Sequence, residues 1–372
     1  MLILEQIMHS KKLSYDALFP IMQPYMRDNS IDTVNIFIDF WDVVKSIYKP
    51  EVIETLNSLK TMDRFLISSE TINMVGHYRH FFASRARKFS NIIIYYSDQP
   101  DSYLQELYPE YRNEFYSKRL GETNSVTQTL NRIIKHNVQI TKVFCEYVPH
   151  VYFINSGDLN HSIVPSLFLR KDSPLEQPVI NSDNQLSIII SNEKIHYQDL
   201  SLNDKILQLE LRGKEKSRVV ASEDIIGIMK AKSKKEYNFS ILPEMTPVLN
   251  ALTGYKNYDI PSVKKTGDIK ALTLVQKLID ESRISNIRYD NLDWINELSN
   301  EKGFTPEHLD EVERNFKLLN HTFYPIRTNQ VINIQNQLIE RIDAKAVRYV
   351  NDQYFKQYPI LIDFVFEGEE YE

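Results

Sequence analysis

Three apolar stretches of this chain lead directly into an acidic side chain. NIFID ends on Asp39, NIIIYYSD ends on Asp98, and LSIII is followed by the turn SNEK, which carries Glu193. Short apolar runs of this kind are typical of buried strands, and open α/β proteins place their ligands beyond the carboxyl ends of parallel strands. The pattern therefore predicts one shared acidic site, built from three strand ends.

Carboxylates gathered at a sheet edge suit hard divalent cations. Mg²⁺ and Mn²⁺ prefer oxygen ligands, and a pair of such ions can hold the attacking and leaving oxygens of a phosphodiester. Aspartate at a strand end is also a common turn former or helix cap, so each acid taken singly is equally compatible with a local role.

The order of the elements predicts an α/β fold. Strand-like and helical segments alternate over residues 30–200, which favours a mainly parallel, doubly wound sheet. Beyond about residue 240 the strand pattern fades, and helices are expected over 244–253, over 268–281, from the Thr305 cap and Pro306, and around 331–338. A further helix is expected over EDIIGIMK, with Ser222 as its cap.

Composition limits the function classes. The chain has 44 basic and 50 acidic side chains, a net charge of −6, so only a local basic surface could hold a polyanion. One cysteine, Cys145, excludes an internal disulfide and fits a reducing cytoplasm. Nine glycines leave no glycine-rich phosphate loop, and no apolar run approaches the ~20 residues of a membrane helix.

Two acidic segments resemble the flap endonuclease and 5′-3′ exonuclease family, which has a PIN-like nuclease fold. NIFIDFWDVV is similar to the opening strand of the family and implies a metal ligand at Asp39. IIIYYSDQPDSYLQELYPEYR is similar to the next strand and its downstream segment, which implies a second ligand at Asp98 and a catalytic cation at Arg112. Lys118 and Arg119 would then stabilise phosphate charge.

Two further segments resemble the same family but depart from its acidic pattern. In YFINSGDLNHSIVPSLF, Asp158 stands for a metal-binding glutamate, whereas Asn160 and His161 occupy the positions of two aspartates. In SNEKIHYQ, Glu193 stands for the first acid of an Asp-Lys-Asp group and Ile195 replaces the second. Because fewer negative ligands lower the affinity for hard cations, Mg²⁺ or Mn²⁺ is expected to be weakly bound or absent.

A last segment, LTGYKNYDIPSVKKTGDIKAL, resembles the helix-hairpin-helix region that grips duplex DNA in this family. The resemblance implies DNA contacts through a short basic segment: Lys264, Lys265, Gly267 and Lys270. Tyr255 and Tyr258 replace two aspartates of the family pattern. The domains expected on this basis are a nuclease-fold domain over 1–240, the helix-hairpin-helix element over 241–284 and a helical C-terminal extension over 285–372.

These resemblances lead to one hypothesis and two alternatives. The first is a flap-endonuclease-like protein with an eroded nuclease centre, which binds DNA at single-strand to duplex junctions without sequence preference. The alternatives are an active Mg²⁺- or Mn²⁺-dependent 5′ nuclease and a non-catalytic subunit of a viral assembly or replication complex, with protein partners at the C-terminal helices. The few glycines and many Asn, Ile, Lys and Tyr residues suggest an AT-rich genome and a bacteriophage origin, which would place the protein in the host cytoplasm.

Overall fold

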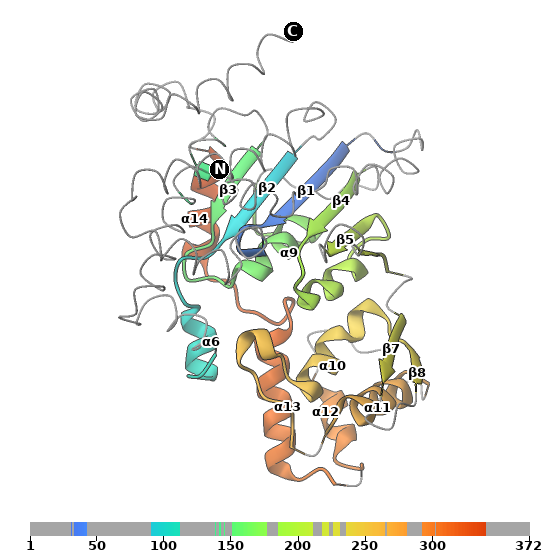
Figure 1. Ribbon diagram of the computed structural model, residues 1–372. Coiled ribbons are helices and arrows are strands. Elements are labelled where there is room, and N and C mark those ends of the chain that lie inside the picture. The colour runs from blue at the N-terminus through green and yellow to red at the C-terminus, as the bar shows by residue number, and fades with distance from the viewer. Residues whose placement is uncertain are drawn as a thin grey trace, which may run out of the picture.

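A parallel sheet and a group of helices beside it form the part of the chain that the structure, a computed structural model, describes (Figure 1). The described residues are 31, 33–42, 91–111, 138, 141–142, 145, 151–176, 185–210, 218–222, 226–230, 236–264, 266–280, 292–301 and 303–339. Among the described helices, none is long and apolar enough to cross a membrane.

The sheet has six strands in the order β3-β2-β1-β4-β5-β6. Their bounds are β1 Thr33–Asp39, β2 Asn91–Tyr96, β3 Val151–Asn155, β4 Gln185–Ile190, β5 Ile206–Glu210 and β6 Arg218–Val220. All neighbours pair in parallel except β6, which runs antiparallel to β5. The predicted mainly parallel sheet is therefore confirmed, and its order reverses between β1 and β4, as in doubly wound sheets.

The apolar runs of the sequence form the buried centre of this sheet. Ile36 of β1 lies in register with Ile92 of β2 on one side and with Ile188 of β4 on the other. After its first residue, β1 is buried at every position, because the central strands of a parallel sheet are covered on both faces. The acids that follow these strands are consequently held on a rigid support.

Short helices continue from the carboxyl ends of the strands. They are α6 (Ser102–Leu107) after β2, the 3₁₀ turn η2 (His161–Ile163) and α9 (Val164–Leu169) after β3, and the 3₁₀ helix η3 (Lys194–Ser201) after β4. Since α9 begins where η2 ends, residues 161–169 form one continuous helical segment after β3.

The later half of the described chain is mainly helical, as predicted. Its helical elements are η4 (Pro243–Met245), α10 (Thr246–Thr253), η5 (Lys256–Tyr258), α11 (Asp268–Asp280), α12 (Asp293–Leu298), α13 (Pro306–Leu319) and α14 (Thr328–Ile339). Helices α10 to α13 lie together beyond the carboxyl end of β1, whereas α14 lies beside β3 (Figure 1). The helix-hairpin-helix assignment and the domain boundaries stay predictions.

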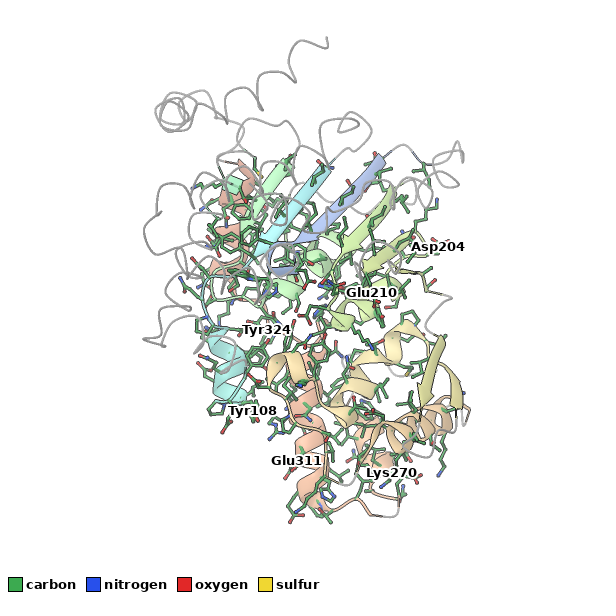
Figure 2. The ribbon with its side chains drawn as sticks, in the orientation of Figure 1. Tyr108, Asp204, Glu210, Lys270, Glu311 and Tyr324 are labelled. Atoms are coloured by element: carbon green, nitrogen blue, oxygen red, sulfur yellow. The ribbon has the colours of Figure 1, made fainter. Side chains whose placement is uncertain are left out.

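Two apolar cores meet at α13. Phe316 belongs to the core formed with α10 and α11, whereas Leu318 and Leu319 belong to the core of the sheet. The guanidinium of Arg314 on α13 lies 4.7 Å from the ring centre of Tyr108, which follows α6 and is labelled in Figure 2. Helix α13 therefore ties the helical group to the sheet.

The helix predicted from Ser222 through EDIIGIMK is wrong. Residues Ile226–Lys230 form strand β7, which pairs antiparallel with β8 (Glu236–Ser240). Ile226 and Ile228 alternate along β7, and β-branched residues at alternate positions favour a strand. Pairing with β8, which the local pattern does not reveal, outweighs the helix signal.

Candidate acidic site at the carboxyl edge of the sheet

The candidate site lies where the strand order reverses, between β1 and β4. Asp39 is the last residue of β1, and Ser191 follows the last residue of β4. In open parallel sheets the chains leaving such a pair of strands turn to opposite sides, and the crevice between them is the usual ligand site. The topology thus brings the first and the last of the predicted acidic segments together.

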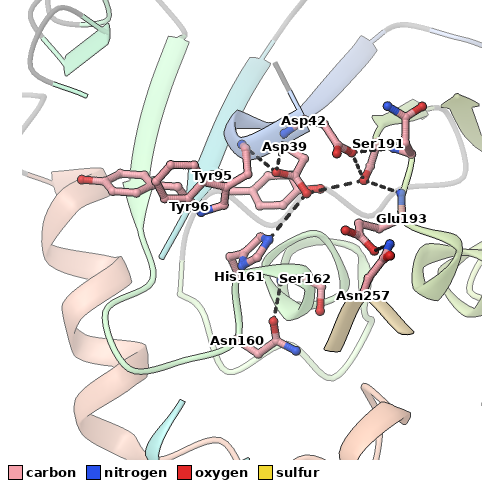
Figure 3. Close-up of polar contacts among 12 residues, drawn as sticks. Asp39, Asp42, Tyr95, Tyr96, Asn160, His161, Ser162, Ser191, Glu193 and Asn257 are labelled. Carbon is pink, nitrogen blue, oxygen red and sulfur yellow. Dashed lines mark hydrogen bonds and ion pairs between the residues drawn. The ribbon is translucent and has the colours of Figure 1, made fainter. Parts of the chain in front are cut away.

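Asp39 is almost completely buried and faces two different groups of donors (Figure 3). Its Oδ1 accepts hydrogen bonds from the backbone N–H groups of Trp41 at 2.9 Å and Asp42 at 3.3 Å, so it caps the helical turn that follows β1. Its Oδ2 lies 3.5 Å from Ser191 Oγ and 3.6 Å from His161 Nε2. One carboxylate therefore combines the local capping role with a place in the shared site.

Asp42 is an acid of the site that the motif comparison did not identify. Its Oδ2 accepts hydrogen bonds from Ser191 Oγ at 2.9 Å and from the backbone N–H of Asn192 at 2.6 Å. The spacing could have revealed it, because residues three apart on a helical turn lie on the same side, and Asp42 follows Asp39 by three. The motifs did not indicate Ser191 either. Its hydroxyl lies within hydrogen-bond distance of both carboxylates and is closer to that of Asp42.

Glu193 is buried as well and is held by the connection between α10 and α11. Its Oε2 accepts hydrogen bonds from Tyr255 Oη at 2.7 Å and from Asn257 Nδ2 at 2.9 Å. Burial and the nearby Glu193 carboxylate raise the pKa of Tyr255 well above its usual value, so this phenol stays a donor. The Tyr255 hydroxyl and the Asn257 amide thus both donate to the same oxygen of Glu193.

The two neutral replacements have different environments. Asn160 accepts a hydrogen bond from the backbone N–H of Ser162 at 3.3 Å and so caps η2. His161 is buried and points toward Asp39, with which it forms the 3.6 Å contact (Figure 3). Of this pair, His161 is the residue that the fold brings to the acidic site.

Two acids follow β2, and the role of the predicted one, Asp98, as a metal ligand stays a prediction. Asp98 is exposed in the bend after the strand, whereas Asp101, three residues on, is 1% exposed. Asp101 accepts hydrogen bonds from the backbone N–H groups of Leu104 at 2.9 Å and Asn160 at 2.8 Å. Burial raises its pKa to about 6 despite these bonds. The buried carboxylate is thus a cap and a connector of two loops.

Asp158 belongs to the surroundings of Asp101. Its carboxylate oxygens accept hydrogen bonds from Ser102 Oγ and Gln330 Nε2, both at 3.3 Å, and lie 4.0 Å from Arg327. These partners come from α6 and from the start of α14, not from β1. The role of Asp158 as a ligand beside Asp39 stays a prediction.

The predicted nucleic-acid contacts lie in the connection between α10 and α11 and in the first turn of α11. Lys264 and Gly267 are exposed, and the ammonium group of Lys270 lies 5.1 Å from the ring centre of Phe304. Lys270 is labelled in Figure 2, near the lower end of the molecule. Four other predicted functional residues lie outside the described part of the chain: Arg112, Lys118, Arg119 and Lys265.

The site contains carboxylates that suit a cation, but their oxygens already accept hydrogen bonds from protein donors. The carboxylates of Asp39 and Asp42 share the Ser191 hydroxyl, and Ser191 Oγ also accepts from the backbone N–H of Glu193 at 3.1 Å. Carboxylate oxygens suit Mg²⁺ or Mn²⁺, and the imidazole of His161 is a neutral additional ligand. Any bound ion would have to compete with the protein donors that these oxygens already accept from.

Comparison with known proteins finds distant structural likeness only. No family model and no curated protein matches the sequence. A bacteriophage T5 flap endonuclease in complex with DNA and metal ions is 12% identical, with a TM-score of 0.44 over 89% of this chain and 99% of that one. The T5 5′-exonuclease with bound zinc is 12% identical, with a TM-score of 0.41 over 91% and 98%. At these values the likeness assigns no activity to this chain.

Proposed function

We propose that this chain is a flap-endonuclease-like protein that binds DNA at single-strand to duplex junctions and whose nuclease centre is eroded. The observation that carries the proposal is the hydrogen bonding of the acidic site. Oxygens of Asp39, Asp42 and Glu193 accept from protein donors, including the Ser191 and Tyr255 hydroxyls. An active two-metal centre would direct such oxygens at the ions.

The expected consequence is weak binding of Mg²⁺ or Mn²⁺. A hard cation gains most from charged oxygen ligands, and an incoming ion must displace the donors that already satisfy them. A lost buried hydrogen bond costs about 1–3 kcal/mol, which is roughly a tenfold to hundredfold loss of affinity. Neutral Asn160 and His161 supply no charge to offset this loss.

The DNA-binding side of the proposal rests on the connection between α10 and α11. It exposes Lys264 and Gly267 just before the first turn of α11. A connection of this type offers lysines and backbone N–H groups to one phosphate strand, which positions DNA without reading its sequence. Since the net charge is −6, this local surface has to provide the attraction.

Binding is tested with a 5′-flap DNA and a blunt duplex of the same length over a salt series. We expect tighter binding to the flap DNA and an affinity that falls steeply with salt, because phosphate contacts release counterions. Absence of binding at low salt would contradict the proposal. It would favour the interaction-subunit alternative, in which the fold is kept for contacts with other proteins.

Cleavage is tested by incubating the flap DNA with Mn²⁺. We expect the wild-type chain to cut no faster than Asp39→Asn, with Asp204→Asn as the matched control at an exposed acid outside the site. Cleavage by the wild-type chain and Asp204→Asn that Asp39→Asn loses would establish the active-nuclease alternative. That alternative has one observation in its favour, since Asp39, Asp42 and His161 still converge.

A third experiment asks whether the tyrosine blocks the centre. Tyr255→Phe removes the hydroxyl that donates to Glu193 Oε2 and leaves the ring in place. We expect Mn²⁺ to bind about tenfold more tightly, in keeping with the release of one hydrogen bond. Tyr324→Phe, which alters a hydroxyl beside Asp101, is the control. Equal or weaker Mn²⁺ binding by Tyr255→Phe would contradict the idea that the Tyr255 hydroxyl blocks metal binding at Glu193.

A further inference from the structure

A second group of buried polar side chains lies outside the acidic site and consists of His196, Asp199 and His321. Their exposed fractions are 0%, 1% and 2%. The nitrogen and oxygen atoms that face the centre of the group all lie within 4.8 Å of one another. His196 Nδ1 is 2.9 Å from Asp199 Oδ2, and His321 Nδ1 is 3.0 Å from Asp199 Oδ1.

Two distant parts of the chain form this group. His196 and Asp199 lie three residues apart on η3, and side chains three apart in a 3₁₀ helix point in the same direction. His321 follows the end of α13, and the Gln198 side chain accepts from its backbone N–H at 2.9 Å. The group thus joins the chain after β4 to the end of the helix that links the two cores.

We propose that His196, Asp199 and His321 form a binding site for a borderline transition metal, of which Zn²⁺ is the representative. Two imidazoles and one carboxylate are a ligand set that suits Zn²⁺ and its neighbours more than Mg²⁺. The ligands of a tetrahedral zinc stand about 3.4 Å apart, since each lies ~2.1 Å from the ion. The separations of 2.9 and 3.0 Å join the two imidazole nitrogens to different oxygens of Asp199, and one ligand atom from each residue lies within 4.8 Å of the others. Small side-chain rotations would bring the three atoms to the tetrahedral spacing.

The outer nitrogens of both imidazoles have hydroxyl partners. Tyr95 Oη lies 3.2 Å from His196 Nε2, and Ser162 Oγ lies 3.2 Å from His321 Nε2. A hydroxyl can donate to a ring nitrogen or accept from a ring N–H. With Nδ1–H groups that donate to Asp199, the hydroxyls would donate to Nε2. With an ion on Nδ1, the ring proton would reside on Nε2 and the hydroxyl oxygens would accept from it. Loading therefore requires a change of tautomer only, and the hydroxyls orient the rings as metal sites require.

Charge and access are consistent with a cation. Asp199 and His321 line a cavity of about 320 Å³. The cavity offers an entry route and room for a water molecule as the fourth ligand. Arg170 at its rim is neutralised by Asp172, 2.9 Å away.

Another interpretation of the same atoms is a Ser-His-Asp nucleophile formed by Ser162, His321 and Asp199. Ser162 is 0% exposed and does not line the cavity, so no substrate carbonyl can reach its hydroxyl. The nucleophile interpretation is therefore excluded, and the remaining competitor is a purely structural hydrogen-bond network. A measurement of metal binding distinguishes the proposed metal site from such a structural network.

The test is a zinc titration of metal-free protein against a chromophoric chelator. To remove any contribution of the acidic site, the titration uses the Asp39→Asn chain. We expect one Zn²⁺ per chain, and at least a tenfold weaker affinity when His196→Gln or His321→Gln is added, since glutamine keeps polarity but is a poor ligand. Unchanged affinity in both glutamine variants, or absence of zinc binding in the parent, would overturn the proposal.

A second measurement needs no substitution in the group. Co²⁺ added to the metal-free wild-type chain should produce the strong visible absorption of a tetrahedral ion with nitrogen ligands, and Zn²⁺ should abolish it. Co²⁺ held by carboxylates and water absorbs far more weakly. A weak octahedral spectrum would therefore overturn the proposal even if the glutamine variants fail to fold.

Discussion

Ser191 lies between two buried carboxylates, and its hydroxyl reaches Asp42 at 2.9 Å and Asp39 at 3.5 Å. Its oxygen also accepts from the backbone N–H of Glu193. A small polar residue thereby connects all three acids of the site. Burying a polar group without a hydrogen-bond partner destabilises the folded state, so these contacts of Ser191 should contribute measurably to the free energy of unfolding.

Ser191→Ala should lower the free energy of unfolding by about 1–3 kcal/mol, because it removes a donor from buried acceptors. Urea denaturation at neutral pH measures the change. Ser262→Ala, at an exposed position, is the matched control and should stay within about 0.5 kcal/mol of the wild-type value. Equal stability of the two variants would show that the acids are satisfied without Ser191.

Asp101 makes the stability depend on pH. Its pKa is raised from 3.8 to about 6 by burial, so the folded state binds its proton more tightly than the unfolded state. This contribution is complete below pH ~4 and is lost as the pH rises through 6. We expect the wild-type chain to lose about 2–3 kcal/mol relative to Asp101→Asn between pH 4 and pH 7.

Thermal or urea unfolding of both chains over that pH range checks the prediction. Asparagine cannot ionise and keeps one of the two acceptor oxygens, so it loses either the Leu104 or the Asn160 hydrogen bond. This loss shifts the stability by an amount that does not vary with pH, and the prediction concerns the pH dependence alone. A stability difference between the two chains that is constant with pH would mean that Asp101 titrates normally.

At the scale of elements, the connection between α10 and α11 depends on one glycine. Gly254 ends α10 with a φ of 72°, and a Cβ there would lie 2.4 Å from the backbone of Pro261 and Ser262. Tyr255 N–H then donates to Ile260 O at 2.8 Å and closes the loop. This tight path is what brings Tyr255 and Asn257 to Glu193.

Gly254→Ala should therefore destabilise the protein by more than about 2 kcal/mol, through both the left-handed backbone and the clash. Gly267→Ala is a control in the same connection, because a Cβ at Gly267 meets nothing within 4 Å. It should be neutral or raise stability by up to about 1 kcal/mol. Denaturant unfolding of both variants measures this, and similar losses in both would contradict the assignment.

At the scale of the whole molecule, an acidic chain can hold DNA only through a local basic surface. If Lys264 and Lys270 provide part of it, Lys264→Ala together with Lys270→Ala should reduce the slope of log K against log salt by about 1.8, since each phosphate contact contributes about 0.9. Affinity for flap DNA should fall most at low salt.

Fluorescence anisotropy over a salt series provides the measurement. Lys317→Ala is the matched control, because Lys317 lies on α13 and pairs with Glu313. An unchanged slope in the double variant would place the DNA-binding surface elsewhere. A slope that also falls in Lys317→Ala would indicate a general charge effect.

The sequence by itself predicted the central strands β1, β2 and β4 and most helices of the later half, and it indicated Asp39 and Glu193 as candidate acids. Apolar runs such as Leu186 to Ile190 and the stripe of α13 are local patterns with the period of their element, so they can be read without the fold. Parallel order followed from the alternation of strands and helices. The error at Ile226–Lys230 arose because a short apolar run satisfies both periods and the partner strand decides between them.

Only the tertiary structure decided which side chains meet. Asp98 lies exposed in the bend after β2, whereas Asp101 is buried and caps α6. His321 reaches Asp199 across 122 residues of sequence. No local pattern encodes such a contact, since it depends on where α13 ends against the sheet, and that position is set by packing of both cores together.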